Sequence, residues 1–265
     1  MTSPGQGGMV AGTPATSPAS HRSLGTAASL LATLLCPRHD AATIRPRHDV
    51  PPPPGWPEDV AFLVRPRLAP GFPPELVPLL LAASPSSSPA SSFASSFSSS
   101  ASASSSPRYA PRPTPHPATV AIKRVSTPAH PAHGQRCLVA RKRIAPGELV
   151  IPYLGVVHAD VEGRPSPHAE SDYDLSLLRL SGADPRNPFP GLHVSLGVDA
   201  AGAGNAARFV NDYRGVAARP NAEFRVGRGD AGELRMEVWA LKAGIAKGDE
   251  VLVSYGKGWW GARVG

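Results

Sequence analysis

Side chains that could take part in chemistry lie in three short clusters in the second half of this 265-residue chain. Residues 143–155 carry a Pro146-Gly147 turn signal and then alternate as a strand up to Tyr153. The second cluster, residues 205–224, contains the run Arg-Phe-Val-Asn-Asp-Tyr at 208–213. The third cluster, residues 247–256, ends in a second strand-like stretch, and two tryptophans follow at 259–260. Taken singly, each cluster has a plain structural explanation: a hairpin, an asparagine turn, and a strand with a core tyrosine.

Cysteine and histidine chemistry is largely excluded. The two cysteines, Cys36 and Cys137, cannot build a disulfide framework or a Cys-rich zinc cluster, which indicates an intracellular protein. Nothing near Cys137 in the sequence would activate its thiol, so we expect a small core residue. His116, His130 and His133 lie in Pro-rich surroundings, and no metal site is expected there.

In this order and spacing, the three clusters resemble the SET domain of protein lysine methyltransferases over roughly residues 118–260. Tyr153-Leu154-Gly155 is similar to the family's Tyr-x-Gly, and Pro220-Asn221 is similar to its Pro-Asn. The runs 208–211 (Arg-Phe-Val-Asn) and 250–255 (Glu-Val-Leu-Val-Ser-Tyr) resemble Arg-Phe-Ile-Asn and Glu-Leu-x-x-x-Tyr. The resemblance implies a mainly β fold with knot-like C-terminal threading, and S-adenosylmethionine-dependent methyl transfer to the ε-amine of a lysine in a protein substrate, histone or non-histone.

The resemblance also implies a role for each site residue. Tyr255 would be the catalytic tyrosine, with its hydroxyl close to the transferring methyl group, and Tyr153 a second tyrosine of an aromatic channel that desolvates the lysine amine. The cofactor-binding residues would be Asn211, Asp212, Arg208, Phe209, Gly134, Arg136 and Trp260. Val253 and Trp259 would line the substrate channel, and a valine at 253 would leave space for products beyond monomethyl-lysine. Packing of the two tryptophans as an apolar plug is the open alternative.

The sequence departs from the family pattern in two places. The family's Gly-x-Gly falls at Gln135-Arg136-Cys137, with only Gly134 nearby, so a side chain at Cys137 would alter the cofactor loop. The family's Asn-His-Ser reads Asn211-Asp212-Tyr213, and a buried Asp212 without a partner would cost stability. A catalytically inactive SET-like binding module is therefore the alternative function, and a structural β domain without a ligand is a third.

Short alternating apolar runs after residue 118 predict the elements that would position these residues. Strands are expected at 120–125, 137–140, 148–154, 193–198, 222–226, 234–241 and 250–255, with one short helix at 206–211. The folded domain is accordingly predicted over residues 118–262.

The first 117 residues have a different composition and hold most of the 32 prolines. Residues 1–50 are predicted to be a disordered leader, with an organelle targeting peptide as the alternative. In the Pro-rich segment 51–83, the stretches 60–64 and 75–83 could each form a turn or two of helix and pack on the later domain. The Ser-rich stretch 84–117 is predicted to be a flexible linker.

The overall charge constrains partners only weakly. A formal charge of +7 favours acidic partners slightly, but sequence does not show the charges gathered on one face, and direct nucleic-acid binding is not expected. The apolar stretch 27–36 is shorter than the roughly 20 residues that span a bilayer, so no membrane segment is predicted. We expect a monomer, located in the nucleus or, through the leader, in a plastid or another organelle.

Overall fold

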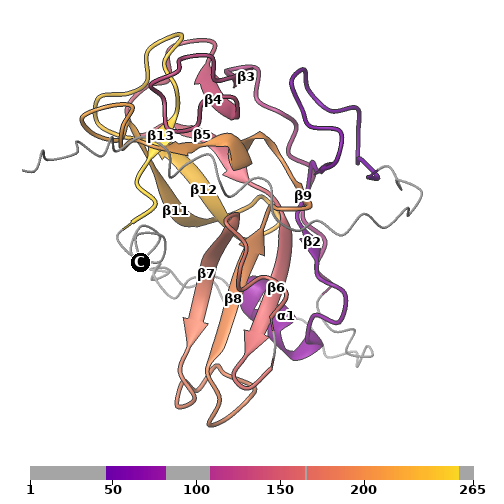
Figure 1. Ribbon diagram of the computed structural model, residues 1–265. Helices are drawn as coiled ribbons and strands as arrows, with labels where there is room; N and C mark the ends of the chain where they lie inside the picture. Colours follow the sequence, from indigo (N-terminus) through magenta and orange to yellow (C-terminus); the bar gives the residue numbers. More distant parts are fainter. Residues whose placement is uncertain (1–45, 82–107, 165, 257–265) are drawn as a thin grey trace, which may run out of the picture. The chain divides into compact units, whose positions relative to one another are not determined.

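The structure is a computed structural model that describes residues 46–81, 108–164 and 166–256. The expected leader up to residue 45, most of the Ser-rich stretch, and Trp259 and Trp260 lie outside these residues. Within the described chain, the mainly β fold is confirmed (Figure 1).

Two sheets hold most of the strand residues. The larger has the order β2-β6-β8-β7, in which only the β2–β6 pair is parallel; its strands are β2 (Arg67–Leu68), β6 (Val156–Val161), β7 (Asp174–Leu180) and β8 (Val194–Asp199). The other is antiparallel with the order β11-β12-β5, formed by β5 (Leu149–Tyr153), β11 (Ala222–Arg228) and β12 (Leu234–Ala240).

Smaller elements complete the described chain. β3 (Val120–Arg124) and β4 (Arg136–Ala140) form a hairpin. Two parallel pairs of two residues each join distant parts of the sequence: β1 (Ala61–Phe62) with β9 (Ala203–Gly204), and β10 (Asn211–Asp212) with β13 (Leu252–Val253). The helical elements are the 3₁₀ turns η1 (Pro74–Leu76) and η2 (Ala206–Phe209) and the helix α1 (Val77–Leu81).

Most predicted elements are found close to their expected bounds. The strands expected at 120–125, 137–140, 148–154, 193–198, 222–226 and 234–241 correspond to β3, β4, β5, β8, β11 and β12, and the helix expected at 206–211 is η2. The expectation for 75–83 is confirmed as η1 and α1, whereas a helix at 60–64 is wrong, because β1 lies there. The strand expected at 250–255 is reduced to the two residues of β13.

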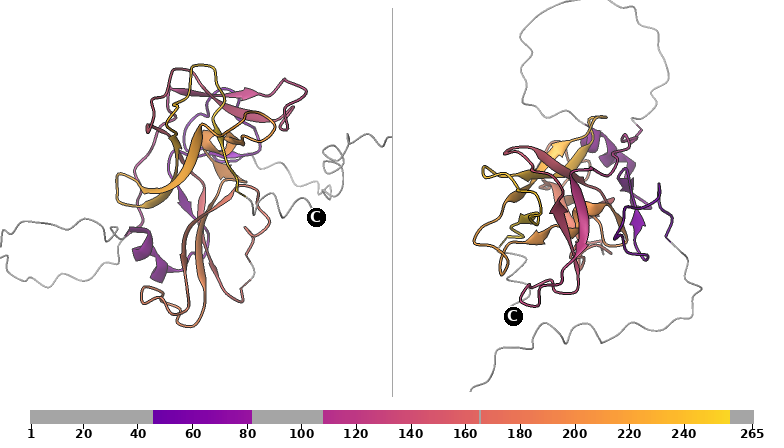
Figure 2. Two further views of the ribbon diagram at one scale, coloured as in Figure 1. Left: turned by 90° about the vertical axis from the view of Figure 1, so that its left-hand side faces the viewer. Right: turned by 90° about the horizontal axis from the view of Figure 1, so that it is seen from above.

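The hydrophobic core extends across the domain boundary expected at residue 118. Residues 46–81, here called the N-terminal segment, place four large buried side chains in the same core cluster as β3, β5 and β8: Trp56, Phe62, Leu76 and Leu80. β1 and β2 of this segment pair with β9 and β6, and Figure 2 shows the segment (indigo to purple) beside the later strands from two sides. The N-terminal segment is therefore part of the same folded unit.

The chain end of the described structure is enclosed by earlier strands. We call residues 249–256 the C-terminal segment. On one side, the N–H of Val251 donates to the Leu138 carbonyl at 2.8 Å, and the carbonyl of Asp249 accepts from Ala140 at 2.9 Å. On the other side, β13 pairs with β10, and the N–H of Asn221 donates to Leu252 at 3.0 Å. This passage between β4 and the 211–221 stretch positions the residues that precede Tyr255.

A polar cluster crosses the middle of the larger sheet. His158 on β6 lies 2.8 Å from Asp174 on β7, although β8 lies between these strands. The contact passes over Gly197 of β8, where a Cβ atom would lie only 2.5 Å from His158 Nε2. The ring of His158 also stacks on that of His168, 4.0 Å between centroids, and His168 Nδ1 lies 2.7 Å from Asp199. These contacts tie the loop between β6 and β7 to the sheet.

Candidate active site

Tyr255 lies next to the residues of β10 that the sequence grouped with it. Its backbone N–H donates to Asp212 Oδ2 at 2.7 Å, and its hydroxyl donates to the Val210 carbonyl at 2.8 Å. Burial raises the pKa of the Tyr255 phenol above its ordinary value, and the nearby Asp212 carboxylate raises it further. The phenol is therefore neutral at physiological pH and is not a general base.

Asp212 has partners, which removes the stability cost expected for this departure from the family pattern. Its carboxylate is buried and accepts the Tyr255 N–H, the Arg214 N–H at 2.8 Å and the Arg214 guanidinium at 2.8 Å. A carboxylate bound by several donors is held in one orientation. Asp212 thus holds the backbone at Tyr255 in place through its side chain, in addition to any contact through its backbone.

Tyr153 lies at the end of β5, and Asn205 fixes the backbone on both sides of it. The Asn205 amide donates to the Pro152 carbonyl at 2.8 Å and accepts the Leu154 N–H at 3.2 Å. Gly155 follows because a Cβ atom there would lie 2.4 Å from the Asp199 carbonyl oxygen. The Tyr-x-Gly pattern therefore has a local reason: the chain turns at a point with no space for a side chain.

Tyr173 connects Tyr153 to Arg208, and sequence reasoning missed it. The Tyr153 hydroxyl donates to the Tyr173 carbonyl at 2.8 Å, and the Arg208 guanidinium lies 4.2 Å from the centroid of the Tyr173 ring. Burial raises the pKa of Tyr153 well above its ordinary value, so this phenol also stays neutral. The only available signal was an aromatic residue just before a strand that alternation did not reveal.

The side chains of Arg208 and Phe209 stabilise the backbone that precedes β10. The Arg208 guanidinium donates to the carbonyls of Ala200 and Ala201, at 2.9 and 3.2 Å. Phe209 is buried and makes an edge contact with Trp56 of the N-terminal segment, 5.4 Å between centroids. Both residues therefore hold η2, which precedes β10, rather than presenting free groups to a ligand.

The residues expected in the cofactor loop have different surroundings. Arg136 Nε donates to the Gly55 carbonyl at 2.7 Å, so this side chain ties β4 to the N-terminal segment. Gly134 lies exposed in the turn before β4, where its N–H donates to Val125. Cys137 packs with Val125 and Val139 in a small separate cluster, and burial raises its pKa to about 11. The expected core role of Cys137 is confirmed.

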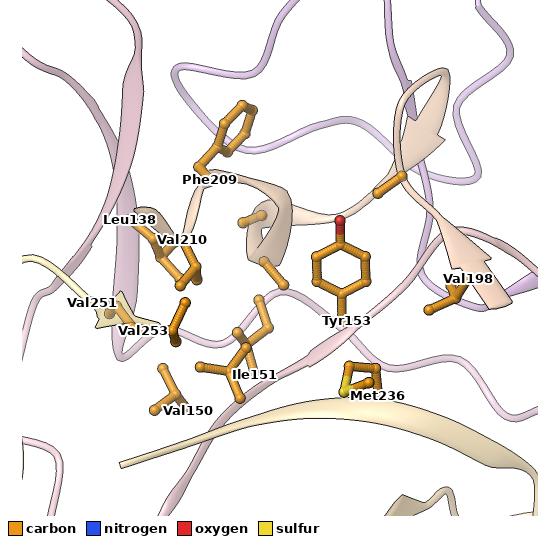
Figure 3. Packing of buried hydrophobic residues seen from close by; sticks show 14 of the residues in the cluster. Leu138, Val150, Ile151, Tyr153, Val198, Phe209, Val210, Met236, Val251 and Val253 are labelled. Carbon is orange, nitrogen blue, oxygen red and sulfur yellow. The ribbon is translucent and has the colours of Figure 1, made fainter. Parts of the chain in front are cut away.

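Val253, expected to line the substrate channel, is buried in the core. It has no exposed surface and belongs to the main core cluster, where Figure 3 shows it among Val251, Val210 and other labelled aliphatic side chains. The roles of Val253 in a substrate channel and in products beyond monomethyl-lysine stay predictions. Trp259 and Trp260 lie outside the described residues.

Asn211 presents a free acceptor. Its Nδ2 donates to Glu250 Oε1 at 2.7 Å and to the Arg136 carbonyl at 3.4 Å. Both partners are acceptors, so the orientation of the amide is unambiguous, and Oδ1 is at the other end. Among the described residues, no donor reaches Oδ1. An ammonium group such as that of S-adenosylmethionine matches this half-buried acceptor, so the residues present fit the cofactor that the family uses.

A profile of the SET domain family matches residues 135–256. This chain contains a SET domain. The match includes Tyr153, Asn211 and Tyr255, and the SET domain is the domain of a methyltransferase family that uses S-adenosylmethionine. No curated protein sequence matches the chain.

Solved structures similar to this SET domain include two of the polycomb repressive complex 2 of Chaetomium thermophilum, one described as autoinhibited and bound to S-adenosylmethionine. In each, the match has 25% identity, a TM-score of 0.35, and covers 52% of this chain and 15% of the other. ATXR5 in complex with mono-methylated histone H3.1 matches at 21% identity with a TM-score of 0.36, over 51% of this chain and 56% of the other.

The described residues show no other obvious centre of chemistry. They contain no group of three or more metal-ligating side chains, and none of their helices is long and apolar enough to cross a membrane. Two surface grooves of about 380 and 420 Å³ lie elsewhere, the first lined by residues such as Pro51 and Pro113, the second by Arg164 and Arg179. None of the predicted site residues lines either groove.

Proposed function

We propose that this SET domain transfers a methyl group from S-adenosylmethionine to the ε-amine of a lysine in a protein substrate. The observation that carries the proposal is the pairing of β10 with β13 together with the hydrogen bond from the Tyr255 N–H to Asp212, which bring Asn211 and Tyr255 close together although they are more than 40 residues apart in the sequence. The substrate, histone or non-histone, the monomeric state and the compartment, nuclear or organellar, stay predictions.

The residues have complementary parts in this reaction. When bound, S-adenosylmethionine supplies a methyl group on a sulfonium sulfur, which a neutral amine attacks in line. Asn211 would hold the cofactor's ammonium through Oδ1, and Tyr255 would direct a neutral hydroxyl toward the transferring methyl group. Protonated Tyr255 and Tyr153 hold no phenolate that could accept the proton of the lysine ammonium. Desolvation in the channel would therefore have to lower the pKa of the lysine so that it releases its proton to water before the neutral amine attacks.

The runner-up is a SET-like binding module without activity. The altered cofactor loop at residues 134–137 favours it, whereas the fixed Asn211 amide and the partners of Asp212 favour the enzyme. Binding of S-adenosylmethionine separates the two functions.

The test compares wild-type protein with Tyr255→Phe. Removing the hydroxyl should lower methyl transfer strongly while the dissociation constant for S-adenosylmethionine stays nearly the same, because the hydroxyl acts mainly in the transition state. The control is Tyr109→Phe, which removes a buried hydroxyl that has no hydrogen-bond partner in the described structure and should leave turnover unchanged. Wild-type protein that shows no calorimetric heat with excess cofactor would establish the binding module instead.

A further inference from the structure

Glu250 connects three elements that are far apart in the sequence. Its Oε2 lies 3.0 Å from Nε2 of His130, in the turn between β3 and β4, and its Oε1 accepts from Asn211 of β10. The side chains of His130 and Glu250 are only 9% and 14% exposed. A carboxylate whose two oxygens are bound by different side chains is fixed in rotation.

The tautomer of His130 is set by its other ring nitrogen. The N–H of Ala132 donates to His130 Nδ1 at 3.0 Å, so in the neutral ring the proton is on Nε2, which donates to Glu250. The turn itself is closed by hydrogen bonds from the His130 N–H to Thr127 and from the His133 N–H to the His130 carbonyl, at 3.1 and 2.9 Å. His130 is thus a donor with a fixed position.

The backbone of Glu250 is fixed independently. The Asn221 amide donates to the Glu250 carbonyl at 2.7 Å and accepts the Leu252 N–H at 2.8 Å, and Glu250 forms a bridge with Val139 of β4. The carboxylate therefore has one direction available, from a fixed backbone toward His130 and Asn211.

We propose that His130 and Glu250 are positioning residues for cofactor binding, which orient the Asn211 amide so that its Oδ1 faces the ammonium group of S-adenosylmethionine. This inference rests on the proposed function. Nδ2 of Asn211 has two acceptors, and the stronger is the Glu250 oxygen at 2.7 Å, which His130 holds in place from the other side. Without His130, the carboxylate can rotate, and the amide loses the contact that decides which of its ends faces the ligand.

The first test needs no ligand. In the full-length protein, hydrogen exchange of the Asn211 side-chain amide, measured by ¹⁵N NMR and assigned with Asn211→Ala, should become at least about tenfold faster in His130→Ala, the factor that corresponds to one ordinary hydrogen bond. His133→Ala, an exposed histidine of the same turn, is the control and should leave the exchange unchanged. His130→Gln, which keeps an N–H near the position of Nε2, should restore slow exchange. Unchanged exchange in His130→Ala would overturn the proposal.

The second test measures the dissociation constant for S-adenosylmethionine by calorimetry. His130→Ala should raise it about tenfold in the wild-type background and not at all in an Asn211→Ala background, because the effect passes through Asn211. Equal weakening in both backgrounds would contradict the proposal and assign His130 a structural role. Failure of the wild-type protein to bind would refute the proposed function, and the amide exchange alone would then decide whether His130 orients Asn211.

Discussion

The N-terminal segment and the C-terminal segment both lie against the central strands, but different interactions hold them. The first is held mainly by large apolar side chains, among them Trp56, Leu76 and Leu80. The second also buries Val251 and Val253, but its position is set by directional hydrogen bonds from buried or half-buried polar groups, above all Asp212 and Asn221. Apolar burial stabilises without specifying an angle, whereas a hydrogen bond specifies one. We infer that the N-terminal segment supplies stability and that the surroundings of the C-terminal segment supply geometry.

Removing the N-terminal segment is expected to have the largest effect. Each large buried side chain contributes about 1.5–3 kcal/mol, and four of them together approach the whole stability of a typical domain, roughly 5–15 kcal/mol. A protein that begins at residue 108 should therefore show no cooperative thermal transition by circular dichroism. A protein that begins at residue 46 is the control and should unfold cooperatively. Cooperative unfolding of the shorter protein would show that the domain folds without this segment.

Truncating a single apolar side chain of the N-terminal segment should lower the free energy of unfolding strongly and cofactor affinity only slightly. Leu76 is fully buried, and Leu76→Ala should lower the free energy of unfolding by about 2–5 kcal/mol through lost burial and a cavity. Denaturant unfolding measures the change, with Leu192→Ala, at an exposed leucine, as the control. If cofactor affinity of the folded fraction fell as much as stability did, the division between the two segments would be wrong.

Asp212→Asn tests whether a polar residue that positions the C-terminal segment affects methyl transfer more than stability. The change weakens the charged contacts with Arg214 and Tyr255, and should lower the free energy of unfolding by about 1–3 kcal/mol while methyl transfer falls more steeply, because Tyr255 is no longer held. Asp184→Asn is a close control, since Asp184 makes the same contacts with Arg186 two residues later but lies in the loop after β7. Thermal unfolding and turnover are measured on the same samples. Equal effects of the two variants on turnover would remove the positioning role of Asp212.

The smallest expected effect is a pH dependence of stability from the polar cluster of the larger sheet. Burial alone would lower the pKa of His158, but Asp174 and Asp160 together raise it above its ordinary value. A raised pKa stabilises the folded state fully below about pH 6.5 and loses this contribution as the pH rises through the folded value. Denaturant unfolding between pH 6 and 9 should show a decline that His158→Gln reduces. The exposed His193→Gln should leave the decline intact; if both variants behave alike, His158 does not cause it.

Alternation revealed the strands of the second half of the chain where one face is apolar, as in β3 and β12. It missed β7, because a register irregularity between Ser176 and Leu178 interrupts the alternation. It also missed β6, where His158 is buried among partners from β7 and from the loop between them, which no local pattern shows. The helix expected at 60–64 failed for a related reason, since β1 exists only through its pairing with β9 more than 140 residues later.

For the site residues too, the sequence showed local patterns but not partners that lie far away in the chain. Tyr255 and Asn211 could be chosen from motif order; in the structure, Asn211 lies on β10, which pairs with β13 two residues before Tyr255. Motif order could not predict the contacts of Arg136 and Phe209. Their partners, Gly55 and Trp56, belong to a segment whose composition suggested a separate region. His130 was visible only as one of several scattered histidines, and its contact with Glu250 spans 120 residues.

The contact between His158 and Asp174 across β8 has a consequence for how this sheet can evolve. The two side chains meet directly above Gly197, where a Cβ atom would lie 2.5 Å from the imidazole and 2.7 Å from the carboxylate. Any side chain gained at 197 would displace both partners, and loss of the histidine alone would leave an empty space beside a carboxylate that has lost this hydrogen bond. Positions 158, 174 and 197 should therefore change together among orthologous sequences, and those with an apolar residue at 158 should tolerate alanine or a larger residue at 197.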